Sequence, residues 1–162
     1  MVSLAYAAIR AQLPSVVRPV SHHVATEKVV IGEGRTSLVF SDPDAVMTVP
    51  AQYLSVSVAG PDLCASRQVY EGYAEGFSTL ARYFVQLAEN WRGWKGSREY
   101  TSIEGDLRIR AIHDGHVTLQ VLLWESRVPS GWRVEAEVRV DAGEALSAAA
   151  SGVTELVRAR LP

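Results

Sequence analysis

Two histidines and an aspartate fall within four residues at His113-Asp114-Gly115-His116, which is the most metal-like pattern in this chain. Imidazole and carboxylate groups are common metal ligands, and two more acids, Glu104 and Asp106, lie shortly before them. Together these side chains suggest a small metal- or ligand-dependent enzyme. Acids at the entry of a strand are, however, more often turn formers or solvated groups than a pair that shares a proton or a cation.

The hairpin register bears on the two histidines. A two-residue loop at Asp114-Gly115 would place apolar Ile109 opposite polar Gln120, which costs the core face of one strand. We therefore expect a three-residue loop at 113–115, with glycine in the left-handed position at its end. The expected pairs are Ala111 with Val117, Ile109 with Leu119 and Leu107 with Val121. His113 then lies at the tip and His116 on the outer face, so we predict turn chemistry and no metal site, with these two histidines as weak candidates.

Three stretches, 107–111, 117–123 and 132–140, alternate apolar and polar residues as in an antiparallel sheet with one buried face. The polar side carries charges of both signs, which is typical of a solvated face with cross-strand pairs. It also carries a tryptophan among arginines, a common composition of binding hot spots. The candidate residues for binding a partner on this side are Arg108, Arg110, Trp124 and Arg133.

The segment Trp91-Arg92-Gly93-Trp94-Lys95-Gly96 follows the clearest helical pattern. Apolar residues recur at three- and four-residue steps from Phe77 to Trp91, and Gly93 is a natural residue just beyond a helix end. We expect Trp91 to close the buried stripe. Trp94, beyond the helix, is the fifth candidate for binding a partner.

The remaining elements complete an α+β fold. Strands are predicted near 29–31, 36–40, 53–58 and 63–69, and the last of these holds Cys64, which we expect to be a small core residue. Helices are predicted over 75–92 and 142–160, the second with Asp141 and Glu144 as a capping box. The prediction is an antiparallel β-sheet with the two main helices packed on one face.

The chain has 162 residues, of which we assign 28–162 to a single domain and 1–27 to a flexible N-terminal arm or start-site extension. The net charge of −2 gives no global attraction to nucleic acid. A nucleic-acid hypothesis would rest only on Arg92, Lys95, Arg98, Arg108 and Arg110.

No apolar run approaches the roughly 20 residues of a membrane span, and no signal peptide is evident, so we expect a cytoplasmic protein. No phosphate-binding, dinucleotide-binding or zinc motif occurs, so we expect no cofactor.

Three motifs taken together resemble an uncharacterised bacterial domain family of unknown function. They are Trp91-Arg92-Gly93-Trp94-x-Gly96, Ser102-Ile103-Glu104-Gly105-Asp106-Leu107 and His113-Asp114-Gly115-His116-Val117. The resemblance covers roughly residues 28–160 and brings no catalytic residues with it. In size and element order the chain is also similar to small α+β immunity proteins of bacterial toxin systems. We therefore expect a non-enzymatic protein-binding module of immunity type, with the His113, His116, Glu104 and Asp106 enzyme as the alternative.

Overall fold

The computed structural model describes residues 27–44, 49–125 and 130–158. The predicted N-terminal arm, apart from Glu27, lies outside the described residues. Eight strands and two helices follow one another along the chain. They are β1 (Lys28–Ile31), β2 (Ser37–Ser41), β3 (Tyr53–Gly60), β4 (Leu63–Tyr70), α1 (Ser78–Glu89), β5 (Ser97–Thr101), β6 (Leu107–His113), β7 (Val117–Trp124), β8 (Arg133–Val140) and α2 (Glu144–Val157).

The α+β class with antiparallel strands and two main helices is confirmed. The strands form two four-stranded sheets, where the sequence analysis expected one. The first sheet has the order β1-β2-β3-β4 and the second the order β5-β6-β7-β8, with every neighbouring pair antiparallel. Alternation along each strand directs one set of side chains into the space between the sheets, where they form one continuous hydrophobic core.

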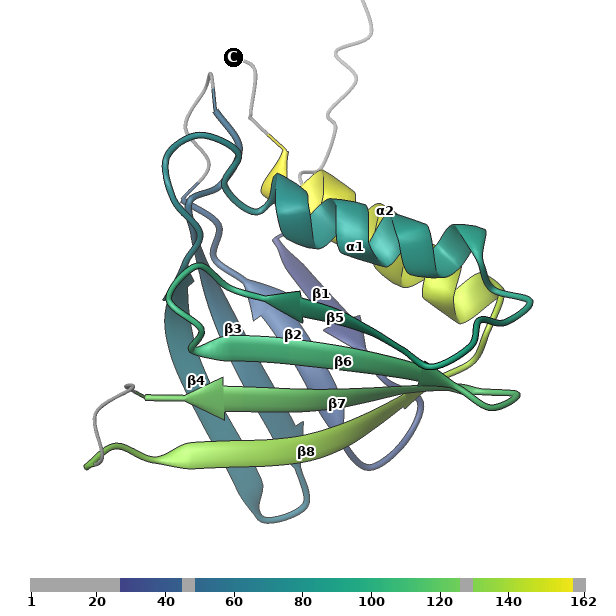
Figure 1. Ribbon diagram of the computed structural model, residues 1–162. Coiled ribbons are helices and arrows are strands. Elements are labelled where there is room, and N and C mark those ends of the chain that lie inside the picture. The colour runs from purple at the N-terminus through teal and green to yellow at the C-terminus, as the bar shows by residue number, and fades with distance from the viewer. Residues whose placement is uncertain (1–26, 45–48, 126–129, 159–162) are drawn as a thin grey trace, which may run out of the picture.

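The two helices pack against each other and fill the core on the side of β1 and β5 (Figure 1). From α1, Phe84 meets Phe40 of β2 edge to face, with ring centroids 6.1 Å apart. Gly152 of α2 lies against Val29 of β1, and a Cβ at that glycine would stand 3.2 Å from both Val29 methyl groups. The missing side chain thus lets the helix approach the first sheet closely.

Strand β5 was missed by the sequence analysis, because its residues Ser97-Arg98-Glu99-Tyr100-Thr101 bury only Tyr100. The capping box predicted at Asp141 is wrong. Helix α2 begins after Gly143, whose φ of 111° suits glycine, and it has no side-chain cap. The prediction for Cys64 is also wrong, since this thiol is exposed on β4.

Candidate functional site

The outer face of the second sheet brings together four of the five residues predicted to bind a partner. Arg108 and Arg110 lie on β6, Trp124 on β7 and Arg133 on β8, all on the side that points away from the core. In Figure 1 the strands β6, β7 and β8 are nearest the viewer, and no helix covers this face. The alternation of residue types therefore predicted the composition of the face correctly.

Trp124 lies between two guanidinium groups. Trp124 and Arg133 are direct cross-strand partners, and the guanidinium carbon of Arg133 is 5.3 Å from the centre of the indole ring. The guanidinium carbon of Arg108, from the strand on the other side, is 6.0 Å away. Both cations are within the range in which an aromatic face attracts a cation. The indole ring of Trp124 thus lies within reach of both guanidinium groups, and the three side chains are called here the Trp124 cluster.

A shallow hollow of about 150 Å³ adjoins the Trp124 cluster. Its floor is Leu122, which is only 8% exposed although it lies on the outer face. The cross-strand neighbours of Leu122 are Arg108 and Glu135, whose long side chains cover it. The other residues that line the hollow are Glu99, Arg110, Gln120, Val121 and Arg133. The site thus has an apolar floor inside a wall of arginines and glutamates.

The ion pairs around this hollow are loose. Arg108 lies 3.6 Å from Glu99, and Arg133 lies 3.6 Å from Glu135, with every one of these side chains at least 45% exposed. Exposed pairs of this kind contribute about 0–1 kcal/mol each, so an incoming charge can replace one partner at little cost. Among the described residues, Arg110 has no ion-pair partner. The face therefore offers guanidinium groups to an external carboxylate.

Trp94 lies on the other side of the second sheet, apart from these four residues. Its ring packs against the core and meets the His113 ring at a centroid distance of 5.0 Å, while the Arg98 guanidinium lies 5.1 Å from the ring centre. Trp91, in contrast, is 44% exposed. The predicted burial of the two tryptophans is therefore reversed, because Trp94 packs against the core and Trp91 is exposed. Helix α1 ends at Glu89, and the Asn90 side chain donates to the Gln86 carbonyl, so Trp91 lies in a turn beyond the buried stripe.

The hairpin after β6 has the predicted three-residue loop, but in another position. The loop consists of Asp114, Gly115 and His116, and the pairs are His113 with Val117, Ala111 with Leu119, Ile109 with Val121 and Leu107 with Leu123. The predicted register was wrong by two residues. Both registers keep the apolar residues on the core face, so alternation could not distinguish them.

This register gives the two histidines different surroundings. His113 Nε2 lies 2.9 Å from the Trp91 carbonyl oxygen, and the Gly115 N–H donates to His113 Nδ1. A neutral ring with its proton on Nε2 satisfies both contacts. His116 is exposed, with Nδ1 3.3 Å from an Asp141 carboxylate oxygen. His113 thus ties the hairpin to the end of α1.

Asp106 lies at the other end of β6 from His113. Leu107 and His113 mark the ends of this strand, and a rise of about 3.3 Å per residue separates them by about 20 Å. The described residues contain no cluster of three or more His, Cys, Asp or Glu side chains able to hold a metal. The four residues of the enzyme alternative therefore do not form one site.

Asp106 has a structural environment instead. It is buried, its Oδ2 accepts from Arg67 Nε of β4 at 2.6 Å, and its Oδ1 accepts from the Ser102 hydroxyl at 2.7 Å. The Ser102 hydroxyl oxygen in turn accepts from the Leu107 N–H. Glu104 is exposed. Asp106 therefore closes the turn between β5 and β6 and joins it to the first sheet.

Glu71 is a half-buried acid that the sequence analysis did not identify. It follows β4, and its carboxylate accepts from the Thr79 hydroxyl of α1 at 2.8 Å and from the Ile103 N–H at 3.0 Å. Burial raises the pKa of Glu71 above its ordinary value, and the two hydrogen bonds partly oppose this effect. The pKa of the neighbouring Tyr100 hydroxyl is also raised, first by burial and then by the charge of Glu71. No sequence pattern marks Glu71, because its partners come from distant parts of the chain.

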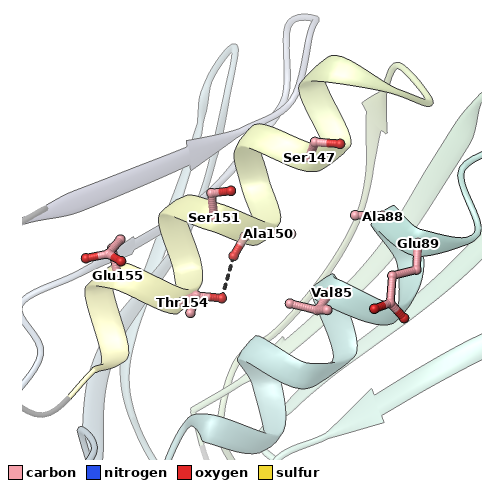
Figure 2. A pocket seen from close by; sticks show the side chains of 8 residues that line it. All are labelled: Val85, Ala88, Glu89, Ser147, Ala150, Ser151, Thr154 and Glu155. Carbon is pink, nitrogen blue, oxygen red and sulfur yellow. Dashed lines mark hydrogen bonds between the residues drawn. The ribbon is translucent and has the colours of Figure 1, made fainter.

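A second hollow lies between the helices (Figure 2). It has a volume of about 340 Å³ and lies between Val85 and Ala88 of α1 and the small residues of one side of α2. Figure 2 shows its two carboxylates, Glu89 and Glu155, at separate positions along the groove. They do not converge on a common point, so this groove presents no catalytic pair.

Neither described helix is long and apolar enough to span a bilayer. No curated protein and no solved structure matches the chain. One family model matches residues 29–160, which is most of the chain and includes every residue of the outer face described above. The chain belongs to a family of unknown function (DUF6228).

Proposed function

We propose that this protein is a non-enzymatic binding module that recognises an acidic surface of another protein through the outer face of β5–β8. The observation that carries the proposal is the Trp124 cluster, in which one indole ring lies between two guanidinium groups beside an uncovered hollow. Tryptophan and arginine are the residues most enriched among interface hot spots.

The charges of the face indicate the chemistry of the partner. Arg108 and Arg133 are held only by loose, exposed pairs with glutamates, and Arg110 is not paired among the described residues. Carboxylates of a partner would meet these guanidinium groups in a two-pronged geometry. An apolar side chain of the partner would pack in the hollow against the aliphatic parts of Arg108 and Glu135, which cover Leu122. We propose an immunity-type role as the specific form of this function, with a toxin of a bacterial toxin system as the partner.

The test is an affinity capture from native lysate with the full chain and two pairs of variants. Trp124→Ala and Arg110→Glu change the outer face. Trp91→Ala and Arg92→Glu are matched controls, because Arg92 also stacks on an exposed tryptophan, at 4.9 Å, but at the end of α1. The captured protein is then titrated against each variant.

We expect the face variants to weaken binding at least about 30-fold, which corresponds to about 2 kcal/mol or more, and the controls to bind as the unchanged chain does. Raising the salt concentration should weaken binding further. Capture of no specific protein, or equal binding by all four variants, would rule out this face as the site. The immunity form fails separately if the recovered partner is not toxic to cells that lack this protein.

A further inference from the structure

The β4 edge differs from the other three sheet edges of the described chain. β1 and β5 are short, with four and five residues, and β5 carries Arg98 and Glu99. β8 has eight residues but bears a charge at every second position from Arg133 to Arg139. Short length and outward charges are the usual means by which proteins keep sheet edges from pairing. Three of the four edges are thus protected.

β4 has neither protection. It has eight residues, and all of them pair with β3 without a bulge. Its outward side chains, Cys64, Ser66, Gln68 and Tyr70, are neutral, and it contains no proline. Its one charged side chain, Arg67, is bound to Asp106. Among the described residues, no backbone group bonds to the free side of this strand.

Apolar surface lies beside this open backbone edge. A hollow of about 380 Å³ runs along it, lined by Leu63, Cys64, Ala65 and Ser66 of β4 and by Trp132 and Val134 across from them. Trp132 is 36% exposed. A strand added to β4 would satisfy the free N–H and C=O groups and cover this apolar surface at the same time.

We propose that β4 pairs antiparallel with β4 of a second copy of this chain, so that two first sheets join into one of eight strands. A second β4 matches the edge in length and in neutrality. β1 or β5 of another copy would leave part of β4 unpaired, and β8 would bring charges that a neutral strand cannot compensate. The inference rests on this edge and not on the proposed function, since the Trp124 cluster lies on the other sheet.

The sequence of β4 also selects the register. A two-fold axis perpendicular to the sheet keeps the same face of both copies turned inward. Opposed residues then point to the same face, so their residue numbers are both odd or both even and their sum is even. The two registers nearest to the middle of the strand place the axis at Ser66 or at Arg67. An axis at Arg67 would bring two guanidinium groups opposite each other, although each has only its own Asp106 as ion-pair partner, whereas an axis at Ser66 opposes two neutral side chains. The axis is therefore at Ser66, with Cys64 opposite Gln68 and Ala65 opposite Arg67.

Light scattering of the full chain over a concentration series tests the assembly. We expect a mass of twice 17.7 kDa for the unchanged chain. Ser66→Lys should reduce it to the mass of one chain because it opposes two like charges at the axis, and so should Ser66→Glu, which guards against misfolding of the first variant. Ser55→Lys on the neighbouring strand β3, away from the edge, is the control and should stay dimeric. Circular dichroism checks that each variant is folded.

Disulfide formation tests the register. In a Cys64→Ser background, Ser66→Cys should form a disulfide-linked dimer on oxidation, because the two copies of residue 66 face each other within reach. Gln68→Cys should not, because its two copies would lie about 13 Å apart, four residues along the strand at about 3.3 Å each. The proposal is overturned if the unchanged chain has the mass of one chain at every concentration. Slow hydrogen exchange of the β4 amides would not rescue it, because in a monomer that protection would mean that another segment of the same chain covers the edge. Folded Ser66→Lys and Ser66→Glu variants that remain dimeric also overturn it.

Discussion

Arg67 Nε donates to Asp106 Oδ2 at 2.6 Å and joins the first sheet to the turn between β5 and β6. A second arginine nitrogen, Nη1, donates to the carbonyl oxygen of Glu125 at the end of β7. One side chain of β4 therefore contacts both the residue before β6 and the residue after β7, which lie side by side at the open end of the β6–β7 hairpin. Asp106 is buried, so its carboxylate has lost its hydrating water, and the hydrogen bonds from Arg67 and Ser102 compensate for that loss.

Asp106→Ala should lower the free energy of unfolding by about 3–5 kcal/mol, because it leaves Arg67 and Ser102 without their partner. Glu104→Ala, two residues earlier and exposed, should change it by about 0.5 kcal/mol or less. Urea unfolding followed by circular dichroism measures both values. Equal losses in the two variants would show that Asp106 does not hold the sheets together.

Trp94→Ala should cost more stability than Trp91→Ala. Trp94 packs against the core and the His113 ring, so its loss should approach the lower end of the range of about 3–5 kcal/mol for large core aromatics. Trp91 is exposed and contacts Arg92, so its loss should cost about 1 kcal/mol or less. Thermal or urea melts of the two variants check this order. The opposite order would show that Trp91, and not Trp94, is the core residue.

Glu71 should make stability fall as pH rises. Its pKa is raised in the folded protein above the ordinary value of 4.5, so the folded state holds this proton more tightly than the unfolded chain does. Below pH 4.5 Glu71 is protonated in both the folded and the unfolded state, and it causes no loss of stability. As pH rises from 4.5 through the folded-state pKa, the unfolded chain ionises first and the folded protein loses stability relative to it.

Glu71→Gln removes this titration and keeps a carbonyl oxygen for the Ile103 N–H or the Thr79 hydroxyl. The difference in unfolding free energy between the variant and the unchanged chain should therefore move in favour of the variant between pH 4.5 and neutrality. Urea melts at several pH values measure this difference. A difference that stays constant, or moves in favour of the unchanged chain, would contradict the raised pKa.

His113→Ala should destabilise the protein by about 1–2 kcal/mol, because it removes the contact with the Trp91 carbonyl and the acceptor of the Gly115 N–H. His116→Ala should have an effect of about 0.5 kcal/mol or less, since that ring is exposed. Hydrogen exchange of the Gly115 amide should quicken only in the first variant. Added zinc should leave the melting temperature of the unchanged chain where it is, and a zinc-dependent rise that His113→Ala abolishes would contradict this structural role.

The sequence by itself determined which residues share a face. Alternation placed Arg108, Arg110, Trp124 and Arg133 on one side of the second sheet, and this result survived an error of two residues in the hairpin register. Side chains repeat every two residues along a strand, so a shift of two changes the neighbours and keeps the face. The helices could be predicted from apolar residues at three- and four-residue steps, and the odd length of the hairpin loop from the need to keep apolar residues on one face.

Only the tertiary structure decided how those faces meet. It divided the strands into two sheets, included the polar stretch Ser97–Thr101 as β5, exposed Cys64 and buried Trp94 in place of Trp91. It also brought Arg67 to Asp106 and Glu71 to Thr79 and Ile103. These outcomes depend on contacts between residues far apart in the chain, and local periodicity carries no information about which distant surface a side chain will meet.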